Sequence, residues 1–203
     1  MFLALFTCFS NIAFCQKVDT VIHKDNYTSY YSYSLHDPLY VNYKLFHGGG
    51  DCSRNGRKFK TDGLPFSATP SDYAGNGYDE GHLADSKDFA YDCNLQEETF
   101  RFYNCVPQTP ALNRGIWKHF ETLIRKESQT DSLMIIAGSI FGSRTIGDDH
   151  VAVPDKCWKI VYSLSTGKVI HSLIFPNDES HTYQEIEIAD LKKLIPYTII
   201  SLH

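Results

Sequence analysis

The sequence lacks an excess of positive charge, long apolar runs and internal repeats, and each absence excludes a class of protein. Its 203 residues carry 19 Lys and Arg against 24 Asp and Glu, a formal charge of −5. This balance excludes a histone-like protein and one that binds nucleic acid through basic tails, but a local basic groove is still compatible with it. No apolar run reaches about 18 residues, so we expect no stable insertion into a membrane.

The first residues have the pattern of a targeting segment. Residues 2–15 read FLALFTCFSNIAFC and carry no charge. We expect residues 1–15 to be a signal peptide, cut near Gln16 after the small residues Ala13 and Cys15, and the protein to be secreted or periplasmic. The alternative is a buried first strand or helix. A lipoprotein cut before Cys15 is disfavoured, because bulky Phe14 precedes that cysteine. Residues 16–203 then form one domain, since a domain has about 150 residues.

Cysteine is scarce in the mature part. Cys52, Cys93, Cys105 and Cys157 remain after export, an even number in an oxidising compartment. Four cysteines allow three pairings, among which the sequence does not choose. We expect two disulfides, or one disulfide and two buried thiols. A zinc site is disfavoured because no C-x-x-C occurs and the gaps are irregular.

The apolar pattern mixes strands and helices without regular β-α-β alternation, which predicts an α+β domain with a central, largely antiparallel sheet and flanking helices. The expected strands are two within 27–46, broken at Asp37-Pro38, one at 133–137, and a hairpin of 157–164 and 168–175. The expected helices are 95–103, opened by Asn94 and Glu97, 110–127, and 188–194. Residues 61–77 are expected to form a long loop, with 78–82 at its end.

Three short segments contain residues suited to chemistry. They are YDEGH at 78–82, FYNCVPQ at 102–108 and NRGIW at 113–117, the last followed by Glu121 and Arg125. Each alone has an ordinary structural explanation. A single His is more often a satisfied residue than a catalyst, Trp117 fits a core, and Glu121 with Arg125 fits a surface ion pair of about 0.3–0.5 kcal/mol. The basic run 54–60 fits a solvated loop.

Taken together and in order, these segments resemble the DNA/RNA non-specific endonuclease family, the ββα-metal nucleases with an Asp-Arg-Gly-His motif. The likeness runs from Tyr33 to Pro196. The matching segments are YVNYKL at 40–45, RKFKTD at 57–62, YDEGHLA at 78–84, NCVPQ at 104–108, LNRGIW at 112–117, VAVP at 151–154 and Trp158-Lys159. The resemblance implies a ββα-metal nuclease-like fold and hydrolysis of DNA and RNA with little sequence preference.

The resemblance also implies the roles at the centre of the reaction. His82 would be the general base, for which an imidazole with a pKa near 6.5 is suited. Asn113 would bind Mg²⁺, or Mn²⁺, through its side-chain oxygen, and sparse protein ligation suits Mg²⁺ because this ion keeps several waters. Glu121, two helical turns beyond Asn113, would hold a water on the metal.

Three further residues have implied roles around this centre. Arg57 and Arg125 would contact or stabilise the substrate phosphate, Arg125 from the same side of the helix as Asn113. Asn104 would orient His82 or its surroundings rather than bind the metal.

Position 80 departs from the family motif, because Glu80 replaces its arginine. A carboxylate beside the proposed base would repel phosphate, and removal of one preorganised cationic group typically costs about 10²–10³ in rate. Three outcomes follow: Glu80 recruits metal, another arginine such as Arg57 or Arg114 supplies the charge, or activity is weak. The alternatives to an active endonuclease are therefore a catalytically weak or inactive nucleic-acid-binding protein, and a phosphodiesterase for small phosphoesters.

Overall fold

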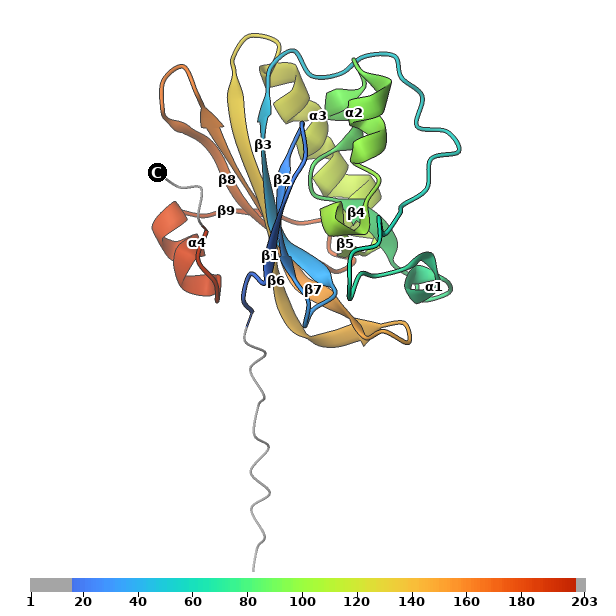
Figure 1. Cartoon of the computed structure of the whole chain (residues 1–203). Helices are drawn as coiled ribbons and strands as arrows, with labels where there is room; N and C mark the ends of the chain where they lie inside the picture. The colour runs from blue at the N-terminus through green and yellow to red at the C-terminus, as the bar shows by residue number, and fades with distance from the viewer. Residues whose placement is uncertain (1–15, 200–203) are drawn as a thin grey trace, which may run out of the picture.

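The computed structural model describes residues 16–199, and a seven-stranded antiparallel sheet runs through it (Figure 1). The strand order is β1-β2-β3-β6-β7-β8-β9. The strands are β1 Thr20–His23, β2 Thr28–Ser32, β3 Asp37–Leu45, β6 Leu133–Ile146, β7 Val151–Ser163, β8 Val169–Pro176 and β9 Gln184–Glu185. The antiparallel sheet confirms the predicted α+β class. The predicted signal peptide, residues 1–15, lies outside the described residues.

A second, two-stranded sheet pairs β4 Asp79–His82 with β5 Cys105–Gln108. It lies with α2 and α3 on one side of the large sheet, and α4 lies on the other (Figure 1). The helices are α1 Pro70–Tyr73, α2 Cys93–Glu98, α3 Lys118–Glu127 and α4 Ile188–Leu194, with the 3₁₀ turns η1 Ser86–Phe89 and η2 Phe102–Asn104 and the π-helical turn η3 Leu112–Trp117. Two short strands and a helix therefore adjoin one face of the main sheet.

Aromatic side chains join the layers on both faces of the large sheet. On one face, the ring of Trp117 lies 5.2 Å from that of Phe175 in β8, and this contact holds η3 and α3 on the sheet. On the other face, Tyr197 stacks on Tyr40 at 5.8 Å. Both layers exclude water, and burying a large apolar side chain contributes about 1.5–3 kcal/mol. The helix that follows Thr109 is thereby fixed relative to the strands.

The predicted helix 110–127 and the predicted hairpin are confirmed. The chain is helical from Pro110 to Glu127, with a wide π turn and a kink at Gly115. The hydroxyl of Thr109 accepts a bond from the Leu112 N–H at 3.2 Å, which caps the first turn. β7 pairs with β8 through the turn at 164–168.

The predicted helix 95–103 is wrong in extent and in its cap. The helix α2 ends at Glu98, and it begins after Asp92, whose carboxylate accepts from the N–H groups of Asn94 and Leu95. It ends early because the carbonyl of Thr99 binds the side chain of Asn104 instead of continuing the helix. The predicted break between the two strands at Asp37-Pro38 is in fact a turn at residues 33–36. Asp37 and Pro38 belong to β3 and pair with β2.

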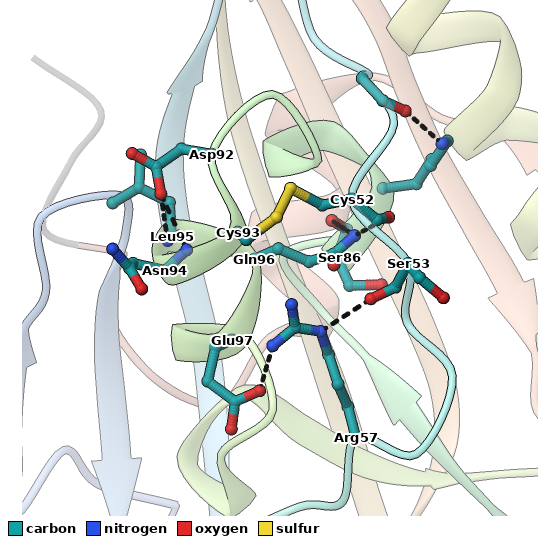
Figure 2. The surroundings of a disulfide bond; sticks show 12 residues. Cys52, Ser53, Arg57, Ser86, Asp92, Cys93, Asn94, Leu95, Gln96 and Glu97 are labelled. Carbon is teal, nitrogen blue, oxygen red and sulfur yellow. Dashed lines mark hydrogen bonds and ion pairs between the residues drawn. A yellow bond between two sulfur atoms is a disulfide. The ribbon is translucent and has the colours of Figure 1, made fainter.

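The cysteines form one disulfide and two buried thiols, which is the second of the two predicted arrangements. Cys52 is bonded to Cys93 (Figure 2), whereas Cys105 and Cys157 are buried and free. Burial raises the pKa of the Cys157 thiol to about 11. Between residues 16 and 199, no helix is long and apolar enough to cross a membrane.

Candidate active site

The sequence had placed His82 at the end of a long loop, but in the structure it lies on a strand. It is the last residue of β4 and pairs with Cys105 of β5. A glycine at the preceding position fits this pairing, because a Cβ on Gly81 would force the buried side chain of Gln108 to move. The pairing of β4 and β5 thus favours the glycine of the motif, and it fixes the backbone beside the imidazole.

The imidazole of His82 is buried and lies against two aromatic rings. The ring centroids of Phe59 and Phe100 are 4.6 Å and 4.8 Å away. Burial, together with the nearby charge of Arg54, lowers the pKa of His82 to about 3. The ring is therefore neutral at neutral pH. Its Nε2 is buried without a hydrogen-bond partner in the described part of the chain, a state that is rare in folded proteins unless water or a ligand uses the atom.

Two side chains hold the backbone of His82 and of the residues after it. The indole of Trp117 donates a hydrogen bond to the carbonyl of His82 at 3.2 Å, which joins the helix to the strand. The fully buried Asn104 accepts from the N–H of Ala84 at 2.9 Å and donates to the carbonyls of Ala84 and Thr99 at 3.0 Å and 2.9 Å. Asn104 thus contacts the chain beside His82 and does not line the cavity described next.

A cavity of about 440 Å³ lies between β4, the helical segment 110–127 and the loop that contains Arg54. Its lining is Arg54, Glu80, His82, Asp85, Lys87, Asn113, Arg114, Lys118, Glu121, Thr122 and Arg125. Five of the residues selected from the sequence therefore meet here, although they are up to 45 positions apart: Glu80, His82, Asn113, Glu121 and Arg125. Arg57 and Asn104 do not line it.

Asn113 lies in the π turn, and its amide orientation follows from its partner. Nδ2 donates to Oδ2 of Asp79 at 2.9 Å, so Oδ1 is left as the available acceptor. Arg114 also binds Asp79, at 2.8 Å and 2.5 Å. Partial burial raises the pKa of Asp79, but the hydrogen bonds from Arg114 and Asn113 outweigh it and hold that pKa below its usual value. Asp79 was missed as a site residue, although it stands in the motif.

Charged side chains of α3 meet the carboxylates of η1. Arg125 donates to Asp88 at 2.9 Å and also binds Asp85, so much of its charge is neutralised locally. Burial and the charge of Asp85 raise the pKa of Glu121, while Lys159 and Arg125 oppose that rise. The i,i+4 ion pair between Glu121 and Arg125 that the spacing allowed is replaced by these longer-range contacts.

The prediction for Arg57 does not agree with its position. Its guanidinium binds the carboxylate of Glu97 and the carbonyl of Ser53 (Figure 2), and the residue does not line the cavity. The cavity is lined instead by Arg54, whose guanidinium lies 5.8 Å from the centroid of Phe100. Arg57 faces elsewhere because Glu97 of α2 offers an ion pair at the base of the loop, which sequence spacing did not indicate.

Glu80 faces the same cavity as His82, as expected for residues two apart on one strand. It is half-buried and forms no ion pair with any residue of the range 16–199. Burial and the adjacent charge of Asp79 raise the pKa of its carboxyl. The replacement of the motif arginine by Glu80 therefore places an unpaired carboxylate in the lining of this cavity.

The donors around this cavity fit a hard divalent cation. Asn113 supplies an amide oxygen, and Glu80 and Glu121 supply carboxylates. Oxygen ligands suit Mg²⁺ and Mn²⁺. No group of three or more His, Cys, Asp or Glu that could hold a metal ion occurs among the described residues.

Comparison with known proteins gives consistent matches. A family model described as DNA/RNA non-specific endonuclease matches residues 9–198. Bovine mitochondrial endonuclease G is 31% identical over 146 residues, which cover 63% of this chain and 49% of that protein. Human mitochondrial nuclease EXOG is 29% identical over 171 residues, covering 71% and 46%. A nuclease from Nostoc sp. is 39% identical over 99 residues, covering 48% and 36%.

The chain thus spans about half the length of the curated relatives endonuclease G and EXOG. Among solved structures, a chain of the crystal structure of the EndoG/EndoGI complex superimposes with a TM-score of 0.80 at 22% identity, covering 86% of this chain and 83% of that one. This likeness shows a common fold, in agreement with the ββα-metal nuclease-like architecture expected from the sequence.

Proposed function

We propose the following function for this chain, which belongs to the DNA/RNA non-specific endonuclease family. The chain is a metal-dependent endonuclease that hydrolyses phosphodiester bonds in DNA and RNA without strong sequence preference. The observation that carries the proposal is the convergence of the His82 imidazole and the Asn113 amide on one cavity from segments 31 positions apart. The family membership supports the reaction class, and the residue roles below are our proposals.

His82 acts as the general base. Its imidazole is neutral at neutral pH because burial opposes the charged form, so a lone pair is available to accept a proton. The same burial makes the ring a weaker base than the free imidazole with a pKa near 6.5 that the sequence led us to expect. The aromatic rings of Phe59 and Phe100 restrict its motion, and the bond from Trp117 fixes its backbone. A water held in the cavity gives a proton to the ring and attacks the phosphorus.

Asn113 Oδ1 would bind the cation, for which Mg²⁺ or Mn²⁺ is suited because both take oxygen ligands. Asp79 keeps the amide in the required orientation, because its carboxylate accepts from Nδ2. Glu121 accepts a hydrogen bond from a water next to the cation. When bound, such an ion neutralises charge that develops on the phosphate oxygens and acidifies a water for the leaving group.

Basic side chains at the cavity hold the nucleic-acid backbone. Arg54, Lys118 and Arg114 lie at its lining, and Arg54 takes the role that the sequence had given to Arg57. The direct phosphate contact predicted for Arg125 stays a prediction, since this residue also neutralises Asp85 and Asp88. Contacts to phosphates carry no sequence information, which supports a non-specific enzyme.

The test is cleavage of plasmid DNA and of structured RNA by the purified chain with Mg²⁺. We expect cleavage of both, its loss in EDTA, and a fall of more than about a hundredfold for His82→Ala. A matched control is His23→Ala, because His23 is exposed in β1 and does not line the cavity. Absence of cleavage by a correctly folded parent that still binds DNA would favour the non-catalytic alternative. Faster turnover of a small chromogenic diester than of DNA would favour a phosphodiesterase.

We also propose that the protein acts outside the cytoplasm. The disulfide between Cys52 and Cys93 supports an oxidising compartment, since such bonds are rare where thiols are kept reduced. Cell fractionation of a tagged full chain tests this, and recovery of the protein only in the cytoplasmic fraction would contradict it.

A further inference from the structure

One segment beside the site has little structure of its own. Residues 48–60, here called the basic arm, leave β3 and run past the cavity without forming a helix or a strand, apart from one bridge at Lys60. Their first half is docked on η1 and the residues after it. The N–H of Gly49 donates to the carbonyl of Asp88 at 3.1 Å, that of Cys52 donates to Ala90 at 3.0 Å, and Lys87 donates to the carbonyl of Gly50 at 2.5 Å.

The helix α2 supplies the strongest anchors (Figure 2). Cys52 is covalently joined to Cys93 at the start of α2, 41 positions later. One turn along, Gln96 donates to the carbonyl of Cys52 at 3.2 Å. Glu97 then binds Arg57 and, at 2.7 Å, Lys60. The arm is thus held to one short helix on both sides of residues 53–56.

Arg54 lies between these anchors and depends on them. Its side chain lines the cavity beside His82 and lies over Phe100. The hydrogen bonds within 53–57 are local, such as Arg57 N–H to the Arg54 carbonyl at 3.2 Å and Asn55 N–H to Ser53 Oγ at 3.1 Å. Besides these local bonds the Arg54 side chain has its contact with the Phe100 ring, and the anchors that flank Arg54 bring it to that ring and to the cavity.

We propose that the Cys52–Cys93 disulfide holds Arg54 at the cavity, so that nucleic-acid binding at the proposed active site depends on the redox state of this bond. The inference rests on the proposed function and adds a regulatory element to it. The bond is accessible to small thiols, because Cys93 is exposed and Cys52 is only half-buried.

The chemistry is ordinary thiol–disulfide exchange. A dithiol such as dithiothreitol attacks one sulfur and then closes to its own cyclic disulfide. It loses two electrons and two protons, which leave Cys52 and Cys93 as thiols. The arm then keeps only its non-covalent anchors, its residues gain conformational freedom, and ordering them on substrate again opposes binding. His82 and Asn113 lie on other elements and stay in place.

The test measures binding apart from cleavage. Fluorescence anisotropy of a labelled DNA oligonucleotide, in EDTA, gives Kd for the oxidised chain, the dithiothreitol-treated chain, Cys52→Ser/Cys93→Ser and Arg54→Gln. We expect each change to weaken binding about tenfold, the loss of one charge-assisted contact. Reduction of Arg54→Gln should add little, because both changes remove the same contact. The control is Lys168→Gln, which removes one positive charge in the turn between β7 and β8. It should keep both the affinity and the redox response.

Several results would overturn the proposal. Equal Kd for oxidised and reduced chains would do so, as would tighter binding after reduction, or additive effects of reduction and Arg54→Gln. If the double serine variant does not fold, as seen by circular dichroism, the oxidised Arg54→Gln and the reduced native chain still decide. A parent that binds in a redox-dependent way but does not cleave with Mg²⁺ contradicts the proposed function alone. A parent that cleaves and binds equally in both states contradicts only the role of the arm.

Discussion

The buried imidazole of His82 makes folding sensitive to acid. The pKa of His82 is about 3 in the folded chain and near 6.5 when unfolded. Between these values the unfolded state binds one more proton, so stability is full above about pH 6.5 and falls as pH drops towards 3, by at most about 1.4 kcal/mol per pH unit. Urea unfolding across this range should therefore show a shallower acid loss for His82→Gln than for the parent.

Buried carboxylic acids change the pH dependence of stability in the opposite direction, and they are the same in the parent and in His82→Gln. Burial raises the pKa of Asp37, which disfavours folding as pH rises and this group ionises. Such contributions cancel in the difference between the parent and His82→Gln. Parallel pH curves for the two proteins would show that the imidazole is not buried neutral.

The substitution Glu80→Gln tests what the departure from the family motif does to substrate binding. When Glu80 is ionised, its carboxylate repels phosphate at the cavity, and Glu80→Gln removes that charge at nearly the same volume. We expect KM for DNA to fall severalfold at low salt, with a smaller fall at high salt because ions screen the repulsion. If Glu80 binds the cation instead, Kd for Mn²⁺ measured by calorimetry rises. Unchanged KM and unchanged Kd would contradict a Glu80 that faces substrate.

Among individual residues, only part of the candidate site could be predicted from the sequence. Residues in ordered motifs, such as His82 and Asn113, were selected because motif order is itself a sequence property. Arg54 was assigned no separate role, because it lies three positions from Arg57 in a loop without periodicity. Which arginine faces the cavity depends on Glu97 and Cys93, 36 or more positions away. Such contacts leave no local pattern.

Asn104 connects two elements, the start of β5 and the segment after β4. Its buried side chain makes three hydrogen bonds, and truncation leaves the N–H and carbonyl of Ala84 and the carbonyl of Thr99 without them. We expect Asn104→Ala to destabilise the chain by at least about 3 kcal/mol, since three buried groups are left unsatisfied and each costs about 1–3 kcal/mol. Chemical unfolding measures this loss.

The same substitution separates a positioning role from a purely structural one. If Asn104 positions His82, kcat falls in Asn104→Ala under conditions where the variant is fully folded, whereas KM changes little. Stability lost with kcat unchanged would limit Asn104 to packing.

Elements with a clear apolar period were predicted, including the short helix α4 at Ile188–Leu194, whereas short elements without such a period were not. The helix 110–127 has a proline at its first turn and an apolar face, and the β7–β8 hairpin has a turn signal between apolar runs. β4 has four residues, DEGH, with no apolar alternation, and only its pairing with β5 makes it a strand. The helix beyond Glu98 ended because of Asn104, a contact that local propensity does not encode.

The molecule as a whole is acidic, so its attraction for nucleic acid has to be local. The formal charge of −5 repels a polyanion at long range, but beyond about 10 Å that repulsion is screened at 0.1 M salt. Near the cavity, Arg125 offsets Asp85 and Asp88, and Arg114 offsets Asp79, which leaves Arg54, Lys87 and Lys118 as the lining cations without an ion pair in the described residues. Binding should consequently weaken steeply as salt rises.

Lys118 offers a direct measure of this local field. It is exposed, lines the cavity and forms no ion pair within the described residues. Lys118→Gln should weaken binding of DNA and RNA alike and reduce the slope of log K against log salt by about 0.7–0.9, the value for one lost phosphate contact. Anisotropy titrations at several salt concentrations measure the slope, with Lys168→Gln as the control that leaves it unchanged. An unaltered slope for Lys118→Gln, or a loss confined to particular base sequences, would mean that the backbone does not pass this end of the cavity.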